Sequence, residues 1–379
     1  MKKLMKKESV MKNTQSLILV MSLIVIVIVF TVLSKGIFLK NRNISMLARQ
    51  ATVVGVISIA MMFVIIAGHI DLSIGSVLGC CGTIAGALMV WKDWGTVPTI
   101  LAVIVIGVAI GAWNGYWVAY RKIPAFIATL ASMLIFKGAK LGIGKSMSIA
   151  PMTPSFTALG QSYLTAGVSI AVAVIVAVAL VISMLRQRKS NEKYGIEQCS
   201  LQKDILKCLA KILLLGVITF MFIQYQGIPV PVIILAILAV IFNFVAKNTT
   251  FGRSVYAIGG NTEAANLAGI KTKRVTLSIY MIAGALAACA GILLTARLDA
   301  ATAAAGDGME LDAIASCVLG GVSMSGGSGN IGGVIIGALI MAALDNGMSL
   351  INLENYWQFV VKGLVLLLAV WADQSFKKN

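Results

Sequence analysis

Long runs of apolar residues, separated by short polar links, follow one another along almost the whole sequence. Because about 20 consecutive apolar residues cross a bilayer as a helix, each run of that length predicts a transmembrane span. The longest run is rich in glycine and holds enough residues for two helices, so we expect an all-α polytopic bundle of about ten to twelve spans. The predicted spans cover residues 17–34, 46–67, 72–90, 97–118, 125–143, 166–185, 209–225, 230–246, 275–296, 311–347 and 356–372.

Composition supports lipid as the main solvent of this chain. Of its 379 residues, 59% are hydrophobic and only 12% are charged. An ordinary soluble domain is about 45–50% apolar and about 25% charged. So few charges cannot cover a water-facing surface of this size, and we treat residues 1–379 as a single transmembrane domain.

Positive charge gathers in a few polar links and predicts the orientation of the chain. The net charge is +17. Nucleic-acid binding is one explanation, but membrane proteins also collect Lys and Arg in cytoplasmic loops. Since most basic residues lie between apolar runs, the second explanation is favoured and no nucleic-acid partner is expected. Both termini and segments 121–122, 186–208 and 247–274 are expected in the cytoplasm, and the weakly charged links 91–96, 144–165 and 226–229 outside.

Polar residues interrupt the apolar pattern between the second and third predicted spans. This stretch, Ala67–Gly75, carries His69, Asp71 and Ser73. Ionisable groups near the membrane are costly and usually face protein or water. We expect Asp71 or Ser73 to cap the helix that begins near Ile74. A place on a substrate pathway and a catalytic His–Asp dyad are the alternatives, and no nucleophile motif accompanies the dyad.

A second interruption lies in the glycine-rich run. Asp307, Glu310 and Asp312 cluster at a membrane edge, and glycines then break the helix within 322–330. Broken helices are tolerated at membrane depth only where they are buried or line a cavity, and their polar backbone can contact a hydroxylated solute. A plain tight turn is the alternative. The predicted substrate pathway therefore consists of His69, Asp71, Ser73, Asn114 and Asp312.

The link 247–274 contains a short, alanine-rich helix, predicted at Thr262–Ala268. Thr262 suits its N-cap, Glu263 suits its positive end and Gly269 can terminate it. A helix of fewer than two turns is marginal alone, so it needs a neighbouring surface or another subunit. Its small side chains, Ala265 among them, would fit a narrow groove of that partner. A solvated loop helix without a role is the alternative.

Neither nucleotide binding nor metal binding is supported by the motifs. The stretch Ala139–Ser146 fits a permissive phosphate-loop pattern, but it ends an apolar span instead of joining a strand to a helix. The six cysteines include no CxxC pair, so neither a zinc site nor a disulfide framework is expected. We therefore expect no metal site, no catalytic residues and no ATPase site within this chain.

Four motifs together resemble the permease family of ribose, xylose and multiple-monosaccharide ABC importers, over about residues 44–373. They read IAGHIDLSIGS, GAWNGYWVAYRKIPAFIATLASMLIFKG, GRSVYAIGGNTEAANLAGI and GMELDAIASCVLGGVSMSGGSGNIGGVIIGAL. The insert 186–208 and the GAWNGYWVAYRK stretch are more similar to the xylose and multiple-monosaccharide branch than to the ribose branch. His69 departs from the pattern, because many members have Gly there, and this leaves the branch and the sugar open.

This resemblance implies a permease of the bacterial cytoplasmic membrane that imports a xylose-like sugar or several monosaccharides. Two permease subunits, expected here to be identical, would form the pathway. A cytoplasmic ATPase would bind the ATP, an extracytoplasmic binding protein would deliver the sugar, and the permease itself would need no cofactor. The loop 247–274 would couple to the ATPase through Asn261, Thr262, Glu263, Ala264, Ala265 and Gly269.

A secondary transporter or channel driven by an ion gradient is the alternative function. Ion-coupled carriers tend to place ionisable residues at the bilayer midplane. Arg49 and Asp345 are the main candidates within the predicted spans, and both lie near span ends. No inverted repeat is evident in the sequence. A membrane-embedded enzyme ranks third, since paired catalytic groups are lacking.

Overall fold

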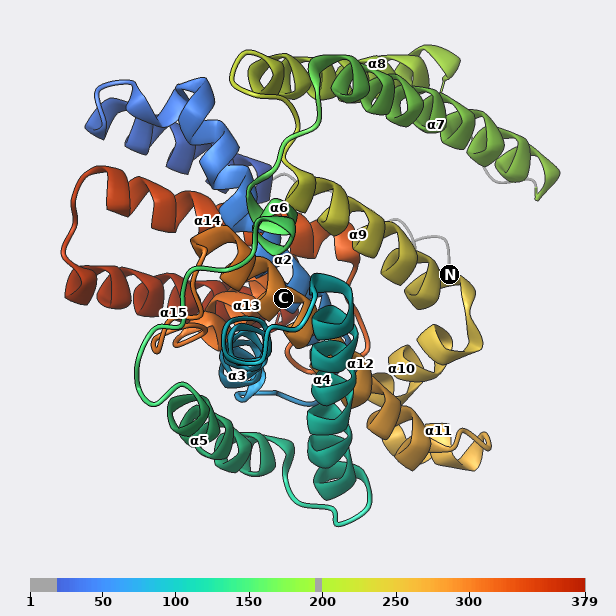
Figure 1. The fold of residues 1–379 in the computed structure, drawn as a ribbon. Helices are drawn as coiled ribbons and strands as arrows, with labels where there is room; N and C mark the ends of the chain where they lie inside the picture. The colour runs from blue at the N-terminus through green and yellow to red at the C-terminus, as the bar shows by residue number, and fades with distance from the viewer. Residues whose placement is uncertain (1–18, 195–199, 379) are drawn as a thin grey trace.

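The computed structural model describes residues 19–194 and 200–378 as a bundle of helices (Figure 1). Over these residues no strand forms, and extended pairing is limited to two isolated bridges. The helices are Leu19–Leu33, η1 Ile37–Leu39, α2 Asn41–Ile66, α3 Ile74–Gly86 with a π-helical turn Ala87–Trp91, α4 Thr96–Ala119, α5 Ala125–Ile143, α6 Pro154–Gln161, α7 Ala166–Lys193, α8 Leu201–Ile223, α9 Val230–Asn248, α10 Thr250–Gly260, α11 Thr262–Leu267, α12 Thr272–Leu298, α13 Met309–Leu319, α14 Ile331–Leu350 and α15 Asn355–Lys378.

The spans agree with the apolar pattern of the sequence. Nine of the described helices are long and apolar enough to cross a membrane, and two shorter apolar helices, Leu19–Leu33 and Asn355–Trp371, accompany them. This confirms the predicted all-α bundle of ten to twelve spans. Both predicted helix breaks are also present, because the link 67–73 separates α2 from α3 and the link 320–330 separates α13 from α14.

The centre of the bundle is built around α12, which packs against α2, α3 and α4. Glycines allow α12 and α4 to approach closely, because a Cβ on Gly284 would overlap the carbonyl oxygen of Gly107. A Cβ on Gly111 would likewise overlap the carbonyl oxygen of Tyr280. Helices in lipid gain little from hydrophobic burial against one another, so close backbone packing between small residues holds them together.

Two pairs of a long and a short helix pack against each other across the bundle. A long helix, a link and a short helix occur twice, first as α2 and α3 and again as α12 and α13. The short helix of each pair packs against the long helix of the other, α3 against α12 and α13 against α2. The two short helices also begin near each other, since a methyl group on Gly75 would overlap the backbone of Gly306 and the side chain of Glu310. The start of α3 and the loop before α13 therefore pack against each other.

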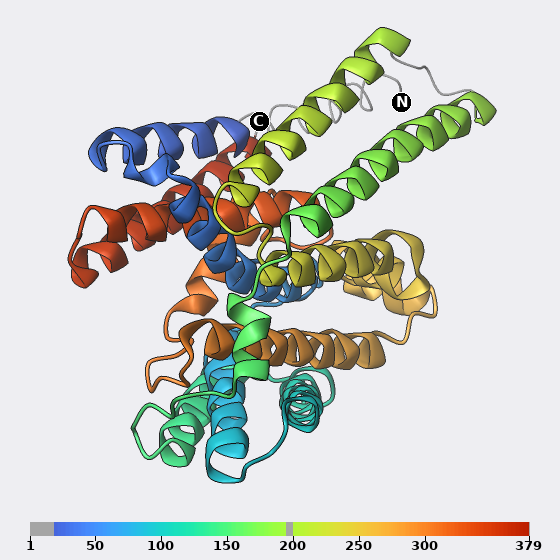
Figure 2. The same cartoon turned by 45° about the horizontal axis from the view of Figure 1, so that its top comes forward.

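Helices α7 and α8 form a hairpin that extends away from the rest of the bundle (Figure 2). α7 continues to Lys193, beyond the predicted end of its span at residue 185, and α8 begins at Leu201, before the predicted start at residue 209. The described parts of the segment 186–208 are therefore mostly helical. Only 6% of the most apolar window of α7 is buried, so most of its surface needs lipid or another protein as a neighbour.

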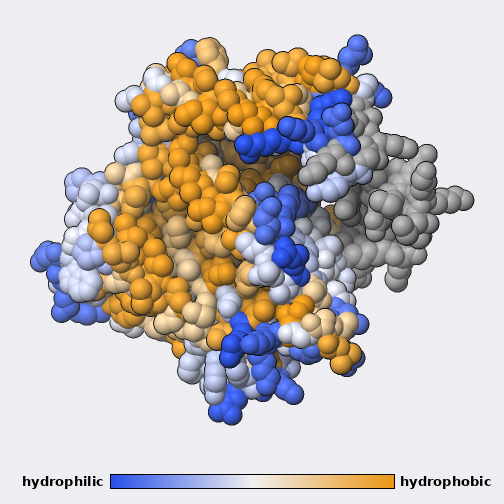
Figure 3. Space-filling model, turned by 90° about the vertical axis from the view of Figure 1, so that its right-hand side faces the viewer, coloured by the Kyte–Doolittle hydropathy of each residue, from blue (hydrophilic) through white to orange (hydrophobic). Residues whose placement is uncertain are grey.

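The outer helices expose apolar side chains on a large scale. Leucine, isoleucine, valine and phenylalanine remain exposed along α4, α5, α7, α8, α9 and α15. Figure 3 shows hydrophobic surface over much of the visible face, with hydrophilic residues gathered in separate patches. A chain with this surface is a multi-pass membrane protein, since water would not solvate it.

Candidate functional site

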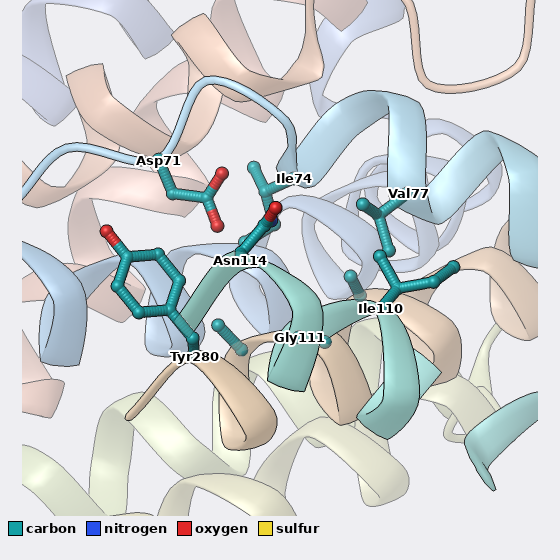
Figure 4. A pocket seen from close by; sticks show the side chains of 10 residues that line it. Asp71, Ile74, Val77, Ile110, Gly111, Asn114 and Tyr280 are labelled. Atoms are coloured by element: carbon teal, nitrogen blue, oxygen red, sulfur yellow. The ribbon is translucent and has the colours of Figure 1, made fainter. Parts of the chain in front are cut away.

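A buried polar cluster occupies the break between α2 and α3 (Figure 4). Asp71 lies in the link 67–73, and its Oδ1 accepts hydrogen bonds from the backbone N–H of Ser73 at 2.8 Å and from the Ser73 hydroxyl at 2.6 Å. The side-chain amide of Asn114, on α4, donates to the same hydroxyl oxygen at 2.8 Å. Ser73 holds the expected position before the first residue of α3, but its hydroxyl makes no capping bond to the helix backbone. Asp71 instead holds the turn that leads into the helix.

This cluster retains polar atoms without a partner. Oδ1 of Asn114 and the hydroxyl of Tyr280, on α12, are both buried and form no hydrogen bond among the described residues. The His69 ring centroid lies 6.2 Å from that of Tyr280 at the edge of the cluster. Apolar side chains and the backbone of Gly111 close the space, which leaves no room for a water molecule. Buried unpaired polar groups are costly, so these two atoms are candidates for a functional role.

Asp312, the remaining member of the predicted pathway, belongs to a different cluster. Its Oδ2 lies 3.0 Å from Nζ of Lys362 on α15, and that ammonium is also 2.9 Å from Oδ2 of Asp345 on α14. The Oδ1 atoms of both aspartates are buried without a partner among the described residues. Lys362 was not among the predicted site residues, although a lysine inside an otherwise apolar span indicates a polar partner within the bundle.

A buried lysine holds the loop between α12 and α13 in place. Lys140 on α5 is buried, and its Nζ donates to the carbonyl oxygen of Ala305 at 2.9 Å and to Oδ1 of Asp307 at 2.9 Å. Lys137 approaches Oδ2 of Asp307 at 3.2 Å. Burial raises the pKa of Asp307, but hydrogen bonds and charges of the two lysines outweigh it and hold the pKa below the ordinary value. Lys140 lies in the phosphate-loop-like stretch, where it binds a carboxylate of its own chain.

The segment predicted to couple to an ATPase consists of α10, α11 and the turn before α12. Oδ1 of Asn261 accepts a hydrogen bond from the backbone N–H of Ala264 at 2.9 Å, so Asn261 is the N-cap of α11. The expectation that Thr262 caps this helix is wrong by one residue, because Thr262 is already helical and its hydroxyl donates to Ile258. At the other end, the Thr272 hydroxyl lies 2.7 Å from Oδ1 of Asn266 and closes the turn.

Helix α11 presents one large apolar side chain to its surroundings. Leu267 is 90% exposed, whereas Ala265 is only 4% exposed and faces its own chain. Burial of Ala265 contradicts the expectation that this residue enters a partner's groove. Glu263 and Ala264 are exposed, and Gly269 has a φ of +82° with open space beside it. The outward surface of α11 is therefore a protruding leucine among small and acidic residues.

Helix α10 connects this surface to both helix breaks. The Tyr256 hydroxyl donates to the carbonyl oxygen of Gly329 at 2.8 Å. The backbone N–H of Gly327 donates to the carbonyl oxygen of Ile66, the last residue of α2, at 2.9 Å. Gly259 lies so close to Ile66 that a Cβ would overlap its carbonyl oxygen. A displacement of α10 would consequently reach the ends of α2 and of the link 320–330.

Among residues 19–194 and 200–378, no group of three or more His, Cys, Asp or Glu is placed to hold a metal ion. Of the predicted site residues, the structure brings together His69, Asp71, Ser73 and Asn114. It places Asp312 with Lys362 instead. The coupling residues Asn261 to Ala265 and Gly269 form one continuous segment.

Comparisons with known proteins point to one family. A family model described as the permease component of branched-chain amino acid transport systems matches residues 43–190 and 195–370. The chain is 44% identical to the xylose transport system permease protein XylH of Haemophilus influenzae, over 97% of this chain and 98% of that protein. It is 42% identical to XylH of Escherichia coli K12, over 97% and 93%. It is 36% identical to the ribose import permease protein RbsC of Bacillus subtilis, over 94% and 91%. No solved structure matches the chain.

The ion pairs of Asp307 generate a prediction about stability. Replacing Asp307 with Asn leaves the buried ammonium of Lys140 with an uncharged partner, and we expect a loss of about 1–3 kcal/mol in unfolding free energy at neutral pH. Because the Asp307 pKa is lowered, its contribution is present above the ordinary value of 3.8 and is lost as the pH falls below it. Thermal unfolding of the purified chain in one detergent measures the effect.

Lys137→Gln is the matched control. The Lys137 side chain is 46% exposed, so its ion pair contributes less than about 1 kcal/mol. An Asp307→Asn variant as stable as Lys137→Gln would show that Lys140 does not depend on the carboxylate.

Proposed function

Because this chain belongs to the permease family that matches nearly all of it, we propose that it is the membrane subunit of an ATP-driven monosaccharide importer. The observation that carries this proposal is the almost full-length similarity to xylose transport permeases, which makes xylose the sugar to test. A separate ATPase subunit binds ATP, an extracytoplasmic binding protein delivers the sugar, and a second copy of this chain completes the pathway.

Vesicles reconstituted with these partners should take up xylose when ATP is supplied to the ATPase. Uptake of another sugar but not of xylose would show that xylose is not the substrate.

The basic segments support a cytoplasmic location for α11 and for both termini. The described part of segment 247–274 carries Lys247, Arg253, Lys271, Lys273 and Arg274 but only one acidic residue, Glu263. We expect the Leu267→Cys variant, in a background with Cys199→Ser, to react with an impermeant thiol reagent only after the cells are permeabilised. The buried Cys208 is unsuitable as such a probe. Labelling from outside intact cells would contradict the predicted orientation and place α11 on the external side.

Coupling to the ATPase is proposed to run through α11 and α10. Leu267 projects from a short helix that Asn261 and Thr272 hold in place. A large apolar side chain with 90% of its surface exposed is unfavourable in water and suits a pocket on a partner. Motion of the partner would move α11 and then α10, whose end packs against Ile66 and the link 320–330.

We expect Leu267→Ala to leave the permease in the membrane at normal levels, because the side chain contributes little to this chain's own packing. Recovery of the ATPase with the permease should fall at least about tenfold, since a central interface anchor is lost. Sugar uptake should fall with it. A pull-down of the ATPase and labelled-sugar uptake, in cells with equal permease levels, measure both effects.

Leu201→Ala provides the matched control. Leu201 is also an exposed leucine, at the start of α8 on the other basic segment. Normal ATPase recovery with Leu267→Ala, together with reduced ATPase recovery with Leu201→Ala, would show that the ATPase docks on the α7–α8 hairpin instead.

The sugar pathway is proposed to pass the polar cluster at the α2–α3 break. Ile66 immediately precedes the link that holds Asp71, so movement of α10 would reach this cluster within a few residues of backbone. Opening would free Oδ1 of Asn114 and the Tyr280 hydroxyl, which have no partner in the closed arrangement, to bind sugar hydroxyls. Asp312, which is held by Lys362, is proposed to position α13.

Replacing Asn114 with Leu keeps a similar volume and removes the amide. We expect sugar uptake to fall about tenfold, because one hydrogen bond to the passing sugar is lost, while ATPase recovery stays normal. Thr99→Val is the matched control, since Thr99 is buried on the same helix and its hydroxyl also lacks a partner among the described residues. Equal uptake by the two variants would exclude Asn114 from the pathway.

A further inference from the structure

A polar cavity lies within the α7–α8 hairpin, apart from the coupling surface and the sugar pathway. Its volume is about 320 Å³, and both helices line it. Gln187, Arg188 and Asn191 come from α7, while Lys207 and Lys211 come from α8. A volume of this size lies at the lower end of the range of small-molecule sites. Every one of these side chains can donate a hydrogen bond, so the cavity is suited to an acceptor-rich ligand.

The charge of this cavity is positive. Arg188 forms an ion pair with Asp204, the one carboxylate among the described residues that line the cavity. Among the described residues, no carboxylate lies within ion-pair distance of Lys207 or Lys211. These two lysines are four residues apart on one helix, where like charges repel each other. An anion between them would remove the repulsion, so the cavity favours a negatively charged ligand.

The depth of the cavity indicates where such an anion comes from. Along α7 the apolar span gives way to basic residues at Arg186, and along α8 the apolar sequence resumes at Leu209. The cavity spans this change, because the apolar side chains of Leu180 and Met184 line it together with the two lysines. It therefore lies where apolar and charged surfaces meet, which is the level of lipid headgroups. The surface of α7 is almost unburied within this chain, so lipid can reach the cavity from the side.

We propose that this cavity binds the phosphate of an anionic phospholipid of the cytoplasmic leaflet. Lys207 and Lys211 contact the phosphate oxygens, and the amides of Gln187 and Asn191 donate to the glycerol headgroup or the phosphodiester. The acyl chains run along Leu180 and Met184 toward the membrane centre. Basic pockets between helices on the cytoplasmic side are the kind of site that anionic headgroups occupy. Lipid bound there would hold the hairpin at a fixed depth, although few contacts tie it to the bundle.

The test measures lipid binding to the purified full-length chain by native mass spectrometry, with phosphatidylglycerol and phosphatidylcholine as probes. The unmodified chain should prefer phosphatidylglycerol. Lys207→Gln/Lys211→Gln should bind it about 30-fold more weakly, because two phosphate-directed charges are lost. Lys207→Arg/Lys211→Arg keeps the charges and should retain the preference.

Lys189→Gln/Lys203→Gln is the matched control, because it removes the same charge from the same hairpin at exposed positions outside the cavity. It should bind phosphatidylglycerol like the unmodified chain. An equal loss of phosphatidylglycerol binding in both double variants would show that binding depends only on the total charge of the hairpin, and would overturn the proposed site. Displacement of phosphatidylglycerol by inorganic phosphate at millimolar concentration would assign the cavity to a soluble anion and overturn the lipid proposal.

Discussion

Where α2 ends, the carbonyl oxygen of Ile66 loses its helical hydrogen-bond partner, and within a bundle surrounded by lipid it must find another. The backbone N–H of Gly327 supplies that partner from the link between α13 and α14. Gly259, near the end of α10, packs against the same carbonyl group. One backbone requirement therefore joins both helix breaks to the segment that leads to α11.

Glycine is needed at this junction for two separate reasons. Gly326 and Gly327 have φ angles of +82° and +74°, which side chains on a Cβ rarely permit. Gly259 has an ordinary φ, but its Cβ position is occupied by the Ile66 backbone. The close approach makes α10, the end of α2 and the link 320–330 a connected unit. In the proposed coupling, movement of α11 would reach the Asp71 cluster through this packed backbone.

Buried charge alone does not separate an ATP-driven permease from an ion-driven carrier in this fold. Asp312, Asp345 and Lys362 form an ion cluster inside the bundle, and Lys140 binds Asp307. Broken helices are also common in secondary transporters. Each of these features would have favoured the alternative function if read in isolation. Membership of the permease family decides between the two classes. The ion pairs then have a structural explanation, because they hold α13 and the loop before it against neighbouring helices.

The sequence by itself indicated ten to twelve spans and both breaks, because a bilayer requires about 20 apolar residues and rejects unsatisfied polar backbone. It also located the short helix α11 by its composition. Which face of α11 is outward was decided only by tertiary packing, which buries Ala265 and exposes Leu267. A helix of six residues has too few positions to show a periodicity.

The sequence also could not show that Asn261 is the N-cap of α11. Asn and Thr both cap well, so only the backbone angles decide between Asn261 and Thr262. Lys140 and Asp307 are 167 residues apart, and Lys362 and Asp312 are 50 residues apart. No local pattern relates such pairs, since they meet only when separate helices pack. In helices that are apolar on every side, periodicity cannot show which face is buried. Tertiary structure alone therefore decided which polar residues meet inside the bundle.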